Sequence, residues 1–226
     1  MKTVVLLSGC GVYDGSEIHE SVFYMLALSE KNIPFFCVAP NINHHHVINH
    51  LNGKEFFEKR NVLEESSRIS RGKITPLEEV DFNNVSSLLI PGGFGVAKNL
   101  SDWAFKGSSS DVLPLVKDLI LHCVRNKKPV VSLCISPTII AKSLEGSEYS
   151  PLLSVGNDQD SSDYDIAEIN NEICALGSKT TNSSFSEISF DENLKIICAP
   201  CYMMKMKVDE VYSNIRIAVE KLKILL

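Results

Sequence analysis

Short apolar runs alternate along the chain with segments of helical periodicity. The runs that predict buried strands cover residues 4–7, 33–39, 86–90, 130–133, 152–155, 188–190 and 195–198. Helices are predicted from Ser16 to about Glu30, from about Asp111 to Arg125, and over residues 208–225. Strands that are apolar throughout and separated by helices indicate a mostly parallel sheet covered on both faces. The fold class predicted is therefore a doubly wound α/β sandwich.

Residues 40–80 form a long excursion between two predicted strands. Residues 55–71 within it are rich in helix formers, so we expect the excursion to be partly helical. An insertion of this size often overhangs a site or makes a subunit contact. With 226 residues, no internal repeat and no low-complexity linker, the chain is expected to be one domain over residues 1–226.

Composition and charge exclude several classes of protein. A hydrophobic content of 44% and a charged content of 22% are ordinary for a globular domain. A net charge of -6 gives no basic surface for nucleic acid, and no apolar run approaches the roughly 20 residues that span a bilayer. Seven cysteines without a recognisable export signal are typical of free thiols in a reducing compartment. We therefore expect a cytoplasmic protein without nucleic-acid or membrane partners.

Cys134 stands between a predicted buried strand and a helical pattern. Ser136 is a suitable N-cap and Pro137 suits the first helical position. The cysteine is thus expected on a tight strand-to-helix turn, where the helix dipole and free N–H groups favour a thiolate. A buried, inert cysteine is the alternative. The turn favours a nucleophile.

Two glycine-containing loops are expected at the same edge of the sheet as Cys134, where ligands of parallel sheets collect. Residues 8–16 follow the first strand and residues 91–95 follow the third. The first loop lacks the glycine spacing of a dinucleotide-binding turn, so no nucleotide cofactor is expected. Candidate N–H donors to a developing oxyanion lie next to the cysteine and in the second loop, although a plain turn would use the same glycines. These donors are Gly92, Gly93 and Ile135.

Glu17 and Glu20 open the first predicted helix. Glutamates in a first turn commonly complement the helix dipole. Because these two share the sheet edge with Cys134 and lie three residues apart, one of them could point at the sulfur. A carboxyl buried there would have a raised pKa and could move protons to and from the thiol.

Three other motifs suggest different chemistry. Cys198 and Cys201 have the spacing of a redox pair but end the last strand, so a core position is favoured for Cys198. Histidines 44–46 with His50 could ligate a metal, but a solvated loop is favoured and no metal site is expected. The aspartates of residues 158–165 lack the glycine and closing glutamate of a calcium loop, so a polar loop at the mouth of the site is predicted.

Together these motifs resemble the ElbB-type proteins, which are named for enhanced lycopene synthesis and belong to the PfpI/ThiJ branch of the class I glutamine amidotransferase-like superfamily. The motifs that carry the resemblance are residues 8–20, 47–51, 91–95, 97–100 and 134–135. The resemblance implies a flavodoxin-like three-layer sandwich, a cysteine on a nucleophile elbow, and a homodimer. It also implies that Glu17 and Glu20 match the superfamily's Glu-x-x-Glu start, with Glu20 facing Cys134. The implied activity is weak, cofactor-free conversion of glyoxal or methylglyoxal to 2-hydroxy acids.

The chain departs from many superfamily members in one respect. All six histidines precede Cys134, and the loop where a partner histidine is usual reads Gly-Asn-Asp at residues 156–158. Without a Cys–His–acid triad, peptidase or glutaminase activity is not expected. Isomerising an oxoaldehyde needs only a thiolate and one proton carrier, so we predict a glyoxalase-type lyase using Cys134 and Glu20. The alternative is a non-catalytic oxidation sensor or regulatory module associated with isoprenoid metabolism.

Overall fold

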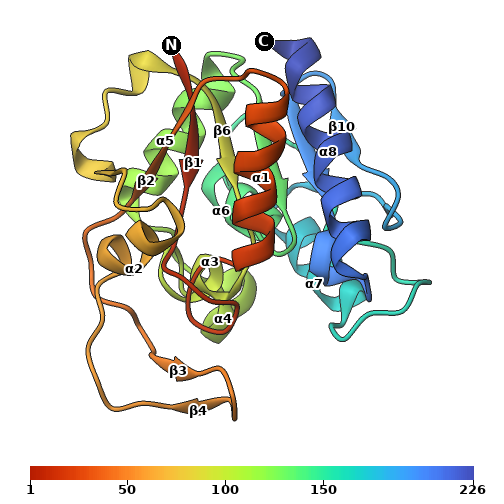
Figure 1. Cartoon of the computed structure of the whole chain (residues 1–226). Helices are drawn as coiled ribbons and strands as arrows, with labels where there is room; N and C mark the ends of the chain where they lie inside the picture. The colour runs from red at the N-terminus through yellow and green to blue at the C-terminus, as the bar shows by residue number, and fades with distance from the viewer.

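A seven-stranded sheet runs through the centre of the computed structural model, which describes residues 1–226 (Figure 1). Its strand order is β10-β11-β7-β6-β1-β2-β5, and only β10 runs antiparallel to its neighbour. The strands are β1 (Lys2–Leu6), β2 (Phe35–Ala39), β5 (Ile74–Pro76), β6 (Val85–Ile90), β7 (Val130–Leu133), β10 (Ser189–Asp191) and β11 (Ile196–Ala199). The central strands β1, β6 and β7 are buried on both faces, which explains their continuous apolar sequences.

Helices cover both faces of this sheet. Helices α1 (Ile18–Glu30) and α8 (Val208–Leu225) pack against each other on one face, and α5 (Pro114–Arg125) packs with α6 (Pro137–Leu144) on the other (Figure 1). The shorter helices are α2 (Val62–Ile69), α3 (Phe94–Lys98), α4 (Trp103–Lys106) and α7 (Ile166–Ala175). Short 3₁₀ turns are η1 (Leu77–Glu79), η2 (Phe82–Asn84), η3 (Gly107–Ser109) and η4 (Cys201–Met203). The predicted three-layer α/β sandwich with a mostly parallel sheet is confirmed.

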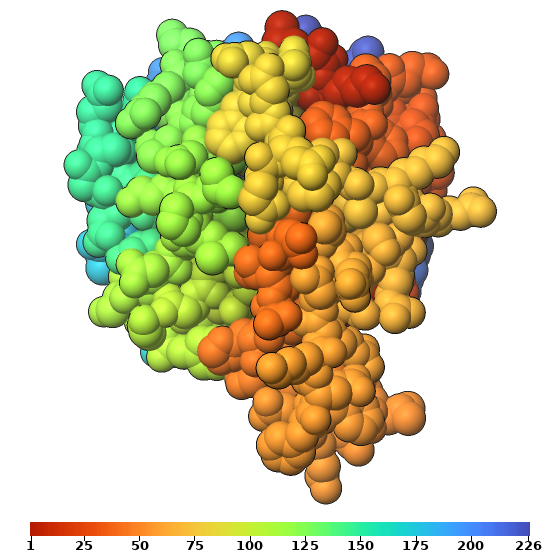
Figure 2. Space-filling model, turned by 90° about the vertical axis from the view of Figure 1, so that its left-hand side faces the viewer, coloured from red at the N-terminus to blue at the C-terminus, as the bar shows by residue number.

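The excursion between β2 and β6 is less helical than its composition indicates. It forms a hairpin of β3 (Ile48–Asn49) and β4 (Lys54–Glu55), then α2, and then the edge strand β5. The helix begins only at Val62, because the Asn61 side chain accepts a hydrogen bond from the Glu64 N–H and caps it there. Figure 2 shows the hairpin projecting from the body of the molecule. Leu51 and Phe57 on this arm are 96% and 101% exposed.

Three further elements differ from the prediction. Only β8 (Leu152–Leu153) forms where a strand over 152–155 was expected, and it pairs with β9 (Lys179–Thr180) outside the main sheet. Helix α7 was not predicted. Helix α1 is capped by Glu17 and not by Ser16, because the Ser16 hydroxyl accepts the Ser8 N–H (2.8 Å) instead. No helix of the chain has both the length and the apolar character needed to cross a bilayer.

Candidate functional site

Cys134 occupies the sharp turn between β7 and α6. Its backbone has φ of 56°, in the left-handed region that costs a side-chain-bearing residue on the order of 1–2 kcal/mol. Its N–H donates to the Ala199 carbonyl at 3.0 Å, which ties the turn to β11. Pro137 is the first residue of α6 as predicted, but the Ser136 hydroxyl donates to the Leu133 carbonyl (2.7 Å) and does not cap the helix. The predicted strand–cysteine–helix turn is therefore present and is held by neighbouring strands.

Glu20 is fully buried beside this turn, on the first turn of α1. One carboxylate oxygen accepts the Gly92 N–H at 2.7 Å, and the other accepts the Tyr202 N–H at 3.4 Å. A methyl group added at Gly92 would lie 2.7 Å from Glu20 Oε2 and 2.8 Å from Cys134 Sγ. A side chain at residue 92 would therefore collide with both the carboxyl group and the thiol, which lie on the same side of Gly92.

Glu17 makes different contacts from those of Glu20. Its carboxylate accepts the Glu20 N–H at 2.7 Å as the N-cap of α1, and its own N–H donates to the Gly92 carbonyl at 2.9 Å. Burial raises the pKa of Glu17 above its ordinary value. Glu20 therefore lies next to Cys134, whereas Glu17 holds the start of α1 and the Gly92 loop together.

Burial gives Glu20 unusual acid–base behaviour. Loss of hydration raises the pKa of Glu20 to about 8, and the nearby Glu17 carboxylate acts in the same direction. Hydrogen bonds from Gly92, Tyr202 and the Cys134 thiol favour the charged form, but they do not offset the burial. Glu20 is consequently protonated at neutral pH and ionises in mildly alkaline solution.

The thiol of Cys134 does not behave as the helix dipole alone predicts. Burial raises the pKa of Cys134 well above its ordinary value, and the Glu20 carboxylate raises it further. The N–H groups of Gly93 and Ile135 hydrogen-bond to the sulfur and lower the pKa, without reversing the direction. The predicted resting thiolate is therefore wrong, because desolvation of the charged form outweighs the dipole and N–H groups of one helix end.

Of the three predicted N–H donors to an oxyanion, one is already bonded to Glu20 and two stay candidates. The Gly92 N–H donates to Glu20, so it is not available to a substrate oxygen. The N–H groups of Gly93 and Ile135 face the sulfur and stay candidates for that role. The prediction of Gly92 as a donor to an oxyanion is corrected on this point.

A cavity of about 340 Å³ opens above the thiol. Its floor includes Cys134 and Gly93, and its walls come from α3, α4, α7, η4 and the loop before α7. Prominent wall residues are Trp103, Phe105, Tyr164, Glu168, Glu172 and Tyr202. The sequence carried no local signal for most of them, since they lie on segments far apart in the chain. Tyr164 is the exception, because the polar loop containing it was predicted at the mouth of the site.

No histidine lines this cavity. The exposed His19 directly precedes Glu20 on α1, and its Nδ1 lies 2.8 Å from the Tyr202 hydroxyl. The sequence has no histidine after Cys134, and no histidine from elsewhere in the chain lines the cavity beside Cys134. The groups within reach of the sulfur are Glu20 and backbone N–H groups.

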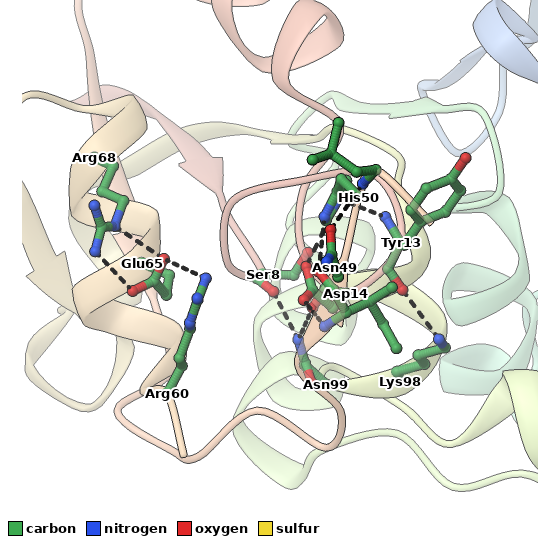
Figure 3. Close-up of polar contacts among 12 residues, drawn as sticks. Ser8, Tyr13, Asp14, Asn49, His50, Arg60, Glu65, Arg68, Lys98 and Asn99 are labelled. Atoms are coloured by element: carbon green, nitrogen blue, oxygen red, sulfur yellow. Dashed lines mark hydrogen bonds and ion pairs between the residues drawn. The ribbon is translucent and has the colours of Figure 1, made fainter. Parts of the chain in front are cut away.

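The histidine-containing excursion is fastened to the glycine loop after β1 (Figure 3). The Tyr13 N–H donates to His50 Nε2 at 3.2 Å, and the Ile48 N–H donates to an Asp14 carboxylate oxygen at 2.6 Å. Asn99 donates from its side-chain nitrogen to the carbonyls of Ser8 and Asp14. The contacts of Ile48 and His50 hold the arm to the glycine loop, and the bonds of Asn99 hold that loop to the end of α3.

The predicted solvated histidine loop is confirmed for His50, which is exposed, and is wrong for His44, which is half-buried. His44 packs against Gly9, so closely that a Cβ there would lie 2.7 Å from its Nε2, whereas the exposed His50 ring lies tilted near Tyr13 with ring centroids 4.9 Å apart. No group of three or more His, Cys, Asp or Glu side chains in the structure is arranged to hold a metal ion.

The Cys-x-x-Cys motif does not form a disulfide, and all seven cysteines are free. Cys198 is a fully buried residue of β11, as predicted. Cys201 is buried as well, with φ of 45°, and its N–H donates to the Asn214 side chain at 3.1 Å. The pair therefore contributes to the packing under α8.

Replacing Gly92 by alanine is expected to lower activity at this site by about a hundredfold. The added methyl would collide with Cys134 and Glu20 and push them apart, and a misplacement of roughly 1 Å can cost that much. Gly92 lacks a left-handed φ, so the effect is steric and does not come from backbone strain. We expect unfolding to become easier by roughly 1–3 kcal/mol. Gly53→Ala, in the open turn of the arm, is the control for activity and should keep full activity, although its φ of 70° makes alanine cost about 1–2 kcal/mol of stability through backbone strain. Thermal unfolding and turnover measure both effects, and an unimpaired Gly92→Ala variant would contradict this geometry.

The sequence of the chain is similar to those of two mammalian mitochondrial proteins. No family model matches it. It is 35% identical over 222 residues to the mitochondrial ES1 protein homolog of Rattus norvegicus, covering 97% of this chain and 82% of that protein. It is 36% identical over 222 residues to the human mitochondrial glutamine amidotransferase-like class 1 domain-containing protein 3, covering 97% and 81%.

Solved structures of other proteins share the fold of this chain. An isoprenoid biosynthesis protein with an amidotransferase-like domain from Ehrlichia chaffeensis superposes with a TM-score of 0.89 at 30% identity, covering 100% of both chains. DJ-1beta from Drosophila melanogaster shares the fold at a TM-score of 0.56 and 15% identity, covering 100% of this chain and 96% of that one.

The comparison also corrects the expected location. The rat and human relatives are named as mitochondrial proteins, which contradicts the cytoplasmic assignment that the free cysteines and the missing export pattern suggested. Free cysteines indicate only a reducing compartment, so cysteine usage does not by itself assign the protein to the cytoplasm. With an identity above 30% over nearly its whole length and a shared fold, the chain belongs to the ES1 and ElbB-type family of glutamine amidotransferase-like class 1 proteins.

Proposed function

We propose that the protein converts small 2-oxoaldehydes such as glyoxal and methylglyoxal to 2-hydroxy acids, with Cys134 as nucleophile and Glu20 as proton carrier. The observation that carries the proposal is a buried carboxyl with a pKa of about 8 that lies with the thiol on the same side of Gly92, at the floor of a cavity. A carboxyl with that pKa exists in both protonation states near neutral pH, which general acid–base catalysis requires.

The first step joins the sulfur to the aldehyde carbon. Ionised Glu20 accepts the Cys134 proton as the carbon–sulfur bond forms, and it returns that proton to the aldehyde oxygen. The product is a hemithioacetal. This route needs no resting thiolate, which is consistent with the raised pKa of Cys134. The N–H groups of Gly93 and Ile135 are placed to stabilise negative charge on the sulfur during the transfer.

The second step moves a hydrogen between adjacent carbons. Ionised Glu20 takes the proton from the former aldehyde carbon and delivers it to the neighbouring carbonyl carbon, while the hemithioacetal hydroxyl proton is transferred to the oxygen of that neighbouring carbon. The former aldehyde carbon is oxidised to a thioester and its neighbour is reduced to an alcohol. Water then hydrolyses the thioester, which releases the 2-hydroxy acid and restores the thiol. The electrons stay within the substrate, so the chemistry requires no external hydride or electron carrier.

The test is turnover of glyoxal and methylglyoxal by protein dialysed against a chelator, without added glutathione. We expect slow formation of glycolate and lactate in amounts equal to the aldehyde consumed. The rate should be low because the superfamily's usual histidine base is missing, and such help is typically worth about a hundredfold or more. Activity that disappears on chelation and returns with zinc, or that requires glutathione, would overturn the proposal.

The oxidation-sensor alternative is less favoured by the site. Susceptibility of a cysteine to peroxide follows its thiolate character and exposure, and Cys134 is buried with a raised pKa. A regulatory role in isoprenoid metabolism, the process named in the description of the Ehrlichia protein, would gain support from one combination of results. That combination is no hydroxy acid from either aldehyde and faster oxidation of Cys134 than of the exposed Cys174.

A further inference from the structure

The cavity above Cys134 has acidic walls without a basic counterpart. Three of its 17 lining residues are glutamates, and none is Lys, Arg or His. Those glutamates are Glu17, Glu168 and Glu172. Glu168 and Glu172 belong to no ion pair of the molecule. Glu172 accepts only a long hydrogen bond (3.4 Å) from the Ser108 N–H. Two carboxylates on one side of α7 are therefore free to meet a ligand.

The rest of the cavity is apolar and larger than glyoxal requires. Twelve of the 17 lining residues are hydrophobic, among them Trp103, Phe105 and Tyr164. A water molecule occupies about 30 Å³ in the liquid, so 340 Å³ corresponds to roughly ten waters. Glyoxal would leave most of that volume unfilled, whereas a ligand with a ring or a short alkyl chain would fill it.

We propose that the natural substrate of this site is a carbonyl compound that carries a cationic group, an ammonium or a guanidinium, on an apolar body. The carbonyl part of this proposal rests on the proposed function, and the charge preference rests on the cavity walls alone. The exposure of each side chain indicates its depth in the cavity: Cys134 is buried at the floor, Glu172 is half-buried, and Glu168 is exposed at the mouth. The carbonyl would therefore lie at the floor and the cation at the mouth.

The chemistry of such a ligand agrees with each part of the site. A cation would be attracted by the carboxylates of Glu168 and Glu172 and by the faces of the aromatic walls. Its positive charge would also favour ionisation of Cys134, which the neighbouring Glu20 opposes. Phosphorylated or carboxylated aldehydes would be repelled, and so would a 2-hydroxy acid product, which aids its release.

Binding can be measured apart from turnover. The Cys134→Ser variant is titrated by calorimetry with three probes of similar size, benzylammonium, benzyl alcohol and benzoate. We expect benzylammonium to bind most tightly and benzoate most weakly, with the difference shrinking as salt is raised. Adding Glu168→Gln and Glu172→Gln should weaken benzylammonium by about tenfold and leave benzyl alcohol nearly unchanged, since partly exposed ion pairs each contribute a few-fold. Glu148→Gln removes one charge from an exposed position outside the cavity and should change neither affinity.

The outcomes separate this inference from the proposed function. Equal affinities for the three probes, a preference for benzoate, or no binding of any probe would overturn it. A preference for benzylammonium that survives the double Gln substitution would overturn it as well. If the wild type fails to convert glyoxal while the glutamate-dependent preference for benzylammonium is present, the proposed reaction is wrong and the charge preference stands.

Discussion

The Cys134→Ser variant is expected to form glycolate from glyoxal at least about a thousandfold more slowly than the wild type. An alcohol in place of the thiol is a much poorer nucleophile towards a carbonyl under these conditions, and Glu20 with a pKa of about 8 is too weak a base to ionise it. Serine is slightly smaller than cysteine and creates no clash at residue 134, whose φ is 56°, so the fold should persist.

Two measurements support this comparison. Thermal unfolding of the variant should stay close to that of the wild type, and mass spectrometry of the wild type with methylglyoxal should place the adduct on the peptide that contains Cys134. The control is Cys174→Ser, which removes an exposed thiol and should leave turnover unchanged. Wild-type rates in Cys134→Ser, or an adduct only on Cys174, would show that Cys134 is not the nucleophile.

The Glu20→Gln variant is expected to lose about a hundred- to ten-thousandfold in turnover, the range of general acid–base catalysis. The wild-type rate should rise with pH up to about 8, because Glu20 acts as a base only when ionised. This rise should be missing from the variant. Glu17→Gln should be milder, since Glu17 caps α1 and contacts the Glu20 backbone. A pH profile that is the same in wild type and Glu20→Gln would contradict the assignment.

The stability of the two proteins provides a readout that is independent of turnover. The folded protein binds the Glu20 proton more tightly than the unfolded chain, since folding raises the pKa from 4.5 to about 8. The stabilisation from this proton is complete below about pH 4.5 and is lost as the pH rises through about 8. Denaturant unfolding should therefore show the wild type losing a few kcal/mol relative to Glu20→Gln between those limits. A constant difference would mean that Glu20 is not desolvated in solution.

Much of the fold was predictable because its elements are encoded locally. Strands buried on both faces are apolar throughout, so β1, β2, β6 and β7 were located to within a few residues. The order of strands and helices then predicts a parallel sheet whose carboxyl edge gathers Cys134, Glu20 and the Gly92 loop, and the structure places them together. Their catalytic roles stay a prediction.

Elements that depend on distant partners were not predictable. Strand β5 has only three residues and exists because it pairs with β2 at the edge of the sheet. Helix α7 has a sequence with two adjacent asparagines, which favour helices weakly, and it is stabilised by packing on α6 and β9. His44 and His50 look like loop residues in sequence, and only the fold brings them against the glycine loop after β1.

The sequence by itself determined the α/β architecture, the elbow at Cys134 and the acidic start of α1, because each depends on residues that are neighbours in the chain. The tertiary structure decided the chemistry available there. A helix end alone predicts a lowered thiol pKa, whereas burial by segments as distant as Trp103, Tyr164 and Tyr202 removes water from the site and raises it. The same packing raises the pKa of Glu20 and creates the acidic cavity. Desolvation depends on everything that surrounds a group, and no local stretch of sequence contains that information.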